Sequence, residues 1–222
     1  AFGILSIFLF IPAWYFRPNI KIDTGVQNLK KNFNNKIVDS APKGLYKLLL
    51  MYFFSGFAFV VSATFTVAIV KTNLNNQELA GYVWLLVGLA SIPSLLFWDF
   101  IENKFGMLYA LCAALLLHVI SLLLTAFFST FIFLLFSALL FGISHLGVVS
   151  LTMTLAGRES PNNPGKEMAR LTIAFALALV IGPSIAGIIS EFQGSYFYSL
   201  ILSALMLFSG ILLLLLRNHK LS

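Results

Sequence analysis

The sequence predicts an all-α protein whose helices form a bundle that crosses a membrane several times. Of its 222 residues, 59% are hydrophobic and 10% are charged, whereas a soluble domain carries about 25% charged residues. The apolar residues occur in long stretches, and the basic residues gather in alternate gaps between them. Long apolar stretches indicate membrane-spanning helices, and the alternation of basic gaps gives those helices a direction across the membrane.

Six stretches come close to the roughly 20 apolar residues that a helix needs to cross a hydrocarbon core. They are residues 46–70, 82–98, 107–127, 131–154, 170–190 and 195–216. A seventh stretch, residues 1–16, is too short to cross at about 1.5 Å per residue. It begins with Ala1 and lacks a basic leader and a small-residue cleavage site. We therefore interpret it as the tail of a truncated helix, and the chain as a fragment.

The basic residues orient the predicted helices, because short positively charged loops are retained in the cytoplasm. All fourteen Lys and Arg residues except Lys71 lie in or next to four segments, 17–45, 99–106, 155–169 and 217–222. We expect these segments to be cytoplasmic. The C-terminus then lies on the cytoplasmic side of the inner (plasma) membrane. The Asn- and Lys-rich segment 17–45 is then a basic linker that contacts the lipid surface.

Composition argues against several other classes of protein. The net charge of +6 is spread over several loops, without the single basic face of a nucleic-acid-binding domain. Cys112 is the only cysteine, so thiols supply neither an internal disulfide nor a metal cluster. No catalytic relay and no Gly-rich phosphate loop is recognisable. We therefore expect no enzyme, no metal and no bound cofactor.

The six apolar stretches divide into two sets of three, residues 46–127 and 131–216. The middle helix of each set is interrupted, and the interruptions are candidates for kinks or gating points: Gly88, Pro93, Gly182, Pro183 and Gly187. Matched interruptions in repeated triplets are typical of secondary transporters, whose kinked helices flank a site near the membrane midplane. A partial helix, a basic linker and six further helices fit the C-terminal half of a twelve-helix transporter.

Four segments then resemble a known family. They are SGFAFVVSATF (55–65), YVWLLVGLASIPS (82–94), SALLFGISHLGVVSLTM (137–153) and the run from MARLT to IGPSIAG (168–187). Residues 46–216 resemble the C-terminal half of the major facilitator superfamily, in particular its YbfB/YjiJ-like branch. The resemblance implies an ion-coupled transporter that moves a small solute by alternating access, together with a missing N-terminal half. It also implies that the first helix of each triplet lines the cavity and that the third, here 107–127 and 195–216, faces lipid.

The superfamily usually carries an acidic residue, a basic residue and a glycine in the cytoplasmic loop after the second helix of a half. This loop holds an inward gate closed through charge pairs. The aligned residues here are Asn103, Lys104 and Gly106, so an amide replaces the acid. Asp99 and Glu102, a turn or less upstream, are candidate partners for Lys104.

The stretch 46–70 carries a stripe of polar side chains. Tyr52, Ser55, Ser62 and Thr66 fall on one helical face, with Phe59 between them. We consider two readings of this stripe. The side chains contact substrate in the cavity, or their small hydroxyls hold neighbouring helices together, as is common in membrane bundles.

His145 is the most notable polar residue of the stretch 131–154, where Thr152 shares its face. An ionisable group inside a membrane span is a functional candidate by default, and histidine exchanges protons near neutral pH. The alternative is a structural histidine bonded to a neighbouring helix. His118 is expected at a similar depth on an outward-facing helix, so paired axial ligation of haem and a structural subunit without transport stay open as alternatives.

Overall fold

The computed structural model describes residues 44–74 and 77–218, which belong to one compact unit, Pro42–Ser222. Within these residues the regular structure is α-helical, and six helices are long and apolar enough to cross a membrane. This confirms the predicted all-α membrane bundle. The expected truncated helix 1–16 and all of the linker 17–45 except its last two residues lie outside the described residues, as does most of the expected tail 217–222.

The helices are longer than most of the apolar stretches that predicted them. They are α3 (Leu45–Leu74), α4 (Gln77–Phe105), α5 (Met107–Phe127), α6 (Phe131–Glu159), α7 (Pro164–Gln193) and α8 (Phe197–Asn218). Polar residues extend α4, α6 and α7 by one to several turns, because the hydrogen-bonded backbone continues past the apolar part of a helix. Only α5, which is apolar from end to end, has the bounds that its apolar stretch predicted.

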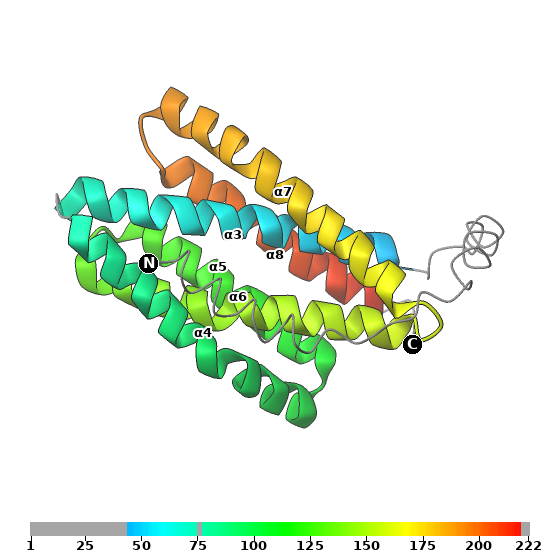
Figure 1. Ribbon diagram of the computed structural model, residues 1–222. Helices are drawn as coiled ribbons and strands as arrows, with labels where there is room; N and C mark the ends of the chain where they lie inside the picture. The colour runs from blue at the N-terminus through cyan, green and yellow to red at the C-terminus, as the bar shows by residue number, and fades with distance from the viewer. Residues whose placement is uncertain (1–43, 75–76, 219–222) are drawn as a thin grey trace, which may run out of the picture. The chain divides into compact units, whose positions relative to one another are not determined.

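Helices of one triplet pack mainly against helices of the other triplet rather than against each other (Figure 1). The helix α3 packs most extensively against α7 and α8, and α6 packs most extensively against α4 and α5. The first helix of each triplet therefore packs on the second and third helices of the other triplet. The third helices, α5 and α8, also contact each other, and the repeat seen in the sequence is matched by this pattern of packing.

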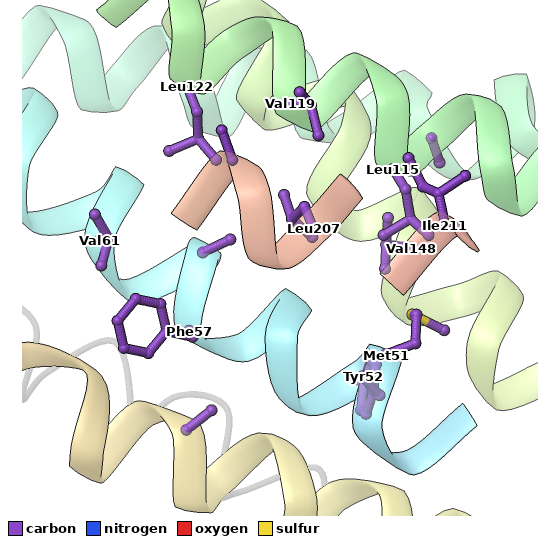
Figure 2. Close-up of a cluster of buried hydrophobic side chains, with 14 of the residues drawn as sticks. Met51, Tyr52, Phe57, Val61, Leu115, Val119, Leu122, Val148, Leu207 and Ile211 are labelled. Carbon is purple, nitrogen blue, oxygen red and sulfur yellow. The ribbon is translucent and has the colours of Figure 1, made fainter. Parts of the chain in front are cut away.

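A hydrophobic core lies where α3, α5, α6 and α8 meet (Figure 2). Leu115 of α5, Met51 of α3 and Leu207 of α8 are essentially inaccessible to solvent. Because lipid is as apolar as these side chains, their association in a membrane depends on close packing rather than on escape from water. By contrast, α4 and α7 are the least buried helices, and they expose large apolar side chains such as Leu96 and Val180.

Two glycines allow the first helix of each triplet to approach a neighbour closely. Gly56 in α3 and Gly142 in α6 each lie eleven residues after the first residue of their helix. A Cβ atom added to Gly56 would lie 2.9 Å from the carbonyl oxygen of Phe175 in α7, and one added to Gly142 would lie 2.5 Å from that of Val87 in α4. Small residues at such contacts are a general device for packing membrane helices.

Candidate functional site

A pocket of about 270 Å³ lies between α3, α4 and α6, and His145 lines it. The other lining residues are Phe59 of α3, Trp84, Val87, Gly88 and Ser91 of α4, and Phe141, Gly142 and Leu146 of α6. Gly88 has open space where a side chain would begin, so its lack of a Cβ leaves room in the pocket. Two of the predicted cavity residues, Phe59 and His145, thus meet at one pocket with the predicted kink residue Gly88.

The imidazole of His145 lies within a group of aromatic rings, which we call the aromatic cluster (Tyr52, Phe59, Phe141, His145 and Phe175). The ring of Phe59 stacks on His145 with 4.0 Å between ring centres and an angle of 25° between ring planes. Phe141 lies almost parallel to the imidazole at 5.8 Å, and Phe175 of α7 lies at 6.2 Å. Tyr52 joins the cluster through Phe175, at 4.9 Å. The imidazole is therefore stacked on Phe59 through one face, and Phe141 and Phe175 lie beside the stacked pair.

His118 lies inside the bundle, although the sequence predicted that its helix faces outward. Its side chain is fully buried, and its Nε2 atom shares a hydrogen bond of 3.3 Å with Ser62 Oγ of α3. The other face of α5 does expose apolar side chains, including Leu116 and Ile120, as a lipid-facing helix should. His118 is on the inner face, and its ring centre is 6.4 Å from that of His145.

The remaining polar candidates are buried between helices rather than placed along the pocket. Ser55, Ser62, Thr66 and Thr152 are each at most 8% exposed. Ser62 bonds His118, which is the helix-joining role considered above. In the part of the chain that the structure describes, four buried polar atoms have no hydrogen-bond partner: Ser55 Oγ, Thr152 Oγ1 and the Nδ1 atoms of His118 and His145. Buried polar atoms without a partner are rare in folded proteins, so these four are unusual.

The two histidines do not offer a haem site. Phe141 contacts both rings, at 5.3 Å from His118 and 5.8 Å from His145, and Phe59 covers one face of His145. His118 also uses Nε2 on Ser62. These contacts leave no slot of porphyrin size between the rings, which paired axial ligation requires.

Three donors of α4 bind backbone carbonyls of α6 beside the pocket. Ser91 Oγ lies 3.1 Å from the carbonyl oxygen of Gly142 and 2.8 Å from that of Val87 in its own helix, so its single hydrogen is shared between the two. Ser94 Oγ and Trp98 Nε1 both donate to the carbonyl of Ile143, at 2.6 and 2.8 Å. The indole of Trp98 covers Gly147, where an added Cβ would overlap the ring. These bonds fix the register between α4 and α6 and so set the depth at which Gly88 faces His145.

The other kink candidates occupy different surroundings. Pro93 and Pro183 are exposed within continuous helices. Gly182 packs against Val60 of α3. Gly187 lines a larger pocket of about 790 Å³ at the ends of α3, α5 and α7 and the start of α8, where Glu191 and Tyr196 also lie. Gly88 and Gly187 thus belong to two separate pockets.

The C-terminal end of α4 is held by a cross-helix ion pair that the sequence did not predict. Glu102 pairs with Arg158 of α6 rather than with Lys104. The ammonium of Lys104 lies over the rings of Phe100 and Phe105, at 5.9 and 5.2 Å from their centres. Within the last turns of α4, Asn103 Nδ2 donates to Asp99 Oδ2 at 3.3 Å. Of the two candidate partners for Lys104, Glu102 thus pairs with Arg158 and Asp99 accepts from Asn103.

Gly106 is the only residue between α4 and α5, and its φ of 94° with ψ of 157° is a conformation that is essentially restricted to glycine. The glycine of the superfamily's loop pattern thus has a geometric reason to be here. An L-amino acid with a side chain would be strained at this corner.

Two aromatic neighbours of His145, Phe141 and Phe175, were missed from the sequence. Phe141 precedes His145 by four residues and so shares its helix face, a spacing that could have identified it. Phe175 comes from α7, and no local pattern connects it with His145.

Comparison with known proteins identifies the family of this chain. No curated protein matches the sequence. A family model described as "Uncharacterised MFS-type transporter YbfB" matches residues 1–215, almost the whole chain. Together with six helices long and apolar enough to cross a membrane, this match shows a multi-pass membrane protein of a transporter family. The chain belongs to the YbfB-like family of the major facilitator superfamily (MFS).

Proposed function

We propose that this protein is a secondary transporter that moves a small solute across the inner membrane by alternating access, and that the solute binds at the pocket beside His145. The observation that carries this proposal is the pocket itself. It combines a histidine held flat by Phe59 with open space at Gly88. Pockets that bind small molecules are mostly apolar with a few well-placed polar groups, and this pocket has that character.

The chemistry of the pocket favours a neutral solute with an aromatic or apolar part. Residues 48–70, 82–98, 107–127, 131–157 and 171–190 contain no Asp, Glu, Lys or Arg, so these spans offer no fixed charge to a solute. The rings of Phe59, Trp84 and Phe141 offer faces for stacking. His145 can donate or accept one hydrogen bond, which would orient the solute.

Alternating access requires two bundles that rock around a shared site. The exposed apolar faces of α4 and α7 support a second bundle as their cover, since Leu96 and Val180 are 77% and 73% exposed. We propose that an N-terminal helical bundle packs on these faces. If transport is driven by protons, the two histidines are the candidate proton carriers in these spans.

Transport can be tested with a mixture of candidate solutes. Vesicles containing the purified protein are loaded with small neutral solutes, both aromatic and aliphatic, and efflux is followed by mass spectrometry. We expect at least one aromatic solute to leave faster than from protein-free vesicles, and His145→Ala to remove most of that difference without lowering the amount of inserted protein. Equal retention of every solute in both kinds of vesicle would contradict the proposal.

The proposed orientation, with the C-terminus in the cytoplasm, has a separate test. In a Cys112→Ser background, we introduce a single cysteine at Asn163 between α6 and α7, or at Ser129 between α5 and α6. An impermeant thiol reagent added to intact cells should label the Ser129 position and spare the Asn163 position until the membrane is opened. The reverse pattern would invert the topology without affecting the proposed pocket.

A further inference from the structure

We propose that the larger pocket, at the ends of α3, α5 and α7 and the start of α8, is a binding site for an organic cation. The carboxylate of Glu191 and a group of aromatic rings in its wall supply the two kinds of contact that bind an ammonium group. The lining residues described for this pocket differ from those of the pocket beside His145, so the site does not depend on the proposed transport. The ammonium group belongs either to a free amine or to a lipid headgroup.

Glu191 gives this pocket a negative charge. It is the only charged residue among the described residues that line the pocket, and it lies in the last turn of α7. Within residues 44–74 and 77–218 it forms no ion pair and accepts no side-chain hydrogen bond. The last turns of α5 and α7 carry no basic residue. The helix dipoles add little, because α7 ends where α8 begins and poles of opposite sign offset each other. The carboxylate therefore needs a donor from a ligand or from water.

Two hydroxyl groups in the wall of the pocket already have acceptors within the protein. Thr125 Oγ1 lies 2.6 Å from Ser137 Oγ and 3.2 Å from the carbonyl oxygen of Ser121. Ser190 Oγ lies 2.8 Å from the carbonyl oxygen of Ala186 and 3.0 Å from a hydroxyl of α8. A hydroxyl has one hydrogen and two lone pairs, so these two groups can offer a ligand an acceptor oxygen. An ammonium group supplies the donors that such a wall lacks.

Aromatic rings from three helices and one turn complete the pocket. Phe65 of α3 lies beside Tyr196, with 4.8 Å between ring centres, and Phe127 of α5 meets Phe197 of α8 edge to face at 5.3 Å. All four residues line the pocket. The face of an aromatic ring attracts a cation, and a ring beside a carboxylate is a recurring way to bind ammonium compounds. The rings therefore favour a cation over an anion of the same size.

The pocket is large enough and open enough for such a ligand. Its volume of about 790 Å³ falls in the range of about 300–1,000 Å³ that is usual for small-molecule sites. Ser129 and Ser195, in the turns that follow α5 and α7, line it and are exposed, so a ligand can enter between the helix ends. A neutral solute would use the rings but leave Glu191 without a partner, and an anion would meet a like charge.

Binding can be tested with two probes of nearly the same shape, benzylammonium and neutral benzyl alcohol. The protein is placed in nanodiscs of phosphatidylglycerol, which has no ammonium group, and each dissociation constant is measured by saturation-transfer NMR against empty nanodiscs. We expect benzylammonium to bind about tenfold more tightly, because a hydrogen bond to a charged group is stronger than one between neutral groups.

Four variants locate the site. Glu191→Gln should weaken benzylammonium about tenfold and leave benzyl alcohol unchanged. Tyr196→Leu should weaken benzylammonium about threefold, since it removes one ring that faces the cation. Gly187 has open space where a side chain would begin, so Gly187→Leu should fill part of the pocket and weaken both probes. Glu78→Gln, the same loss of charge in α4, which contributes no described lining residue, is the matched control and should change neither constant.

Either of two results would overturn the proposal: the same dissociation constant for benzylammonium in the unsubstituted protein and in Glu191→Gln, or an equal loss in Glu191→Gln and Glu78→Gln. If Glu191→Gln is not inserted in the membrane, unchanged binding in Gly187→Leu overturns it instead.

A second lipid composition identifies the source of the ammonium group. The titration is repeated in nanodiscs in which half of the lipid is phosphatidylethanolamine. A weaker apparent affinity for benzylammonium, restored in proportion as that lipid is removed, would assign the site to lipid headgroups, and an unchanged affinity would assign it to free amines. Solute efflux is measured separately, so the loss of the proposed transport would leave this site standing, and the reverse also holds.

Discussion

The helix pairs α3–α7 and α6–α4 occupy equivalent places in the two triplets but are held together in different ways. In both pairs a glycine of the first helix lies against a backbone carbonyl of the second. Between α4 and α6, Ser91, Ser94 and Trp98 add hydrogen bonds to carbonyls of α6. The contacts described between α3 and α7 are apolar: Gly182 against Val60, and the ring of Tyr52 against that of Phe175.

This difference indicates that one pair is fixed in register and the other can adjust. Hydrogen bonds have preferred directions and lengths, so α4 cannot slide along α6 without breaking several of them. An apolar contact loses little when side chains shift by a fraction of a turn. We therefore expect α7 to be the helix that moves most easily against this bundle.

The largest effect should come from Gly142→Ala. Its Cβ would meet the backbone of α4 at 2.5 Å from the carbonyl oxygen of Val87, and the hydrogen bonds beside it resist separation of the helices. Overpacking of this kind costs about 1–3 kcal/mol, and we expect the upper part of that range in the free energy of unfolding in mixed detergent micelles. Gly81→Ala, in the partner helix α4 and with open space around it, is the control and should be neutral.

Gly56→Ala tests the comparison most directly. Its Cβ would lie 2.9 Å from the carbonyl oxygen of Phe175, yet α7 can move aside. We expect a cost near the lower end of the same range, about 1 kcal/mol, measured by the same unfolding assay. If Gly56→Ala and Gly142→Ala cost the same, the two helix pairs are equally rigid and our distinction fails.

Trp98→Phe should have a smaller effect, because it keeps most of the ring over Gly147 and removes only the indole donor. A hydrogen bond between membrane helices contributes about 0.6 kcal/mol on average. Because Ser94 donates to the same carbonyl, the double variant Trp98→Phe with Ser94→Ala should cost more than the sum of the single ones. If the losses in the free energy of unfolding are strictly additive, neither donor compensates for the loss of the other at the carbonyl of Ile143.

The smallest effect on stability is expected at the loop end of the same helix pair. Glu102 is 9% exposed and Arg158 is 60% exposed, so solvent screens the pair in part, and exposed pairs contribute up to about 1 kcal/mol. Glu102→Gln and Arg158→Gln should each destabilise slightly, and the charge-swapped pair Glu102→Arg with Arg158→Glu should recover part of the loss. No recovery in the swapped variant would show that the pair does not fasten α4 to α6.

Sequence alone identified the six helices because each apolar stretch is long enough to cross a membrane. It could not give their polar extensions, since hydropathy stops at the membrane while the helix continues. The inward direction of His118 was missed because α5 is rich in Leu and the family resemblance implied a lipid-facing helix. His118, Ser121 and Thr125 share one helical face and are buried, and this spacing could have shown that the face points inward. Phe59 and His145 were found as candidates, but Phe175 and the pairing of Glu102 with Arg158 join residues that are far apart in the chain.

The single residue between α4 and α5 has a consequence for how motion passes through the protein. With Gly106 as the whole connection, the chain has no slack at this corner, so a tilt of α4 must pull on the start of α5. A lever arm of about three helical turns then separates that corner from His118. Lengthening the corner by inserted residues should let α4 swing while the buried histidine stays still, which would uncouple the wall of the pocket from the hydrogen bonds behind it.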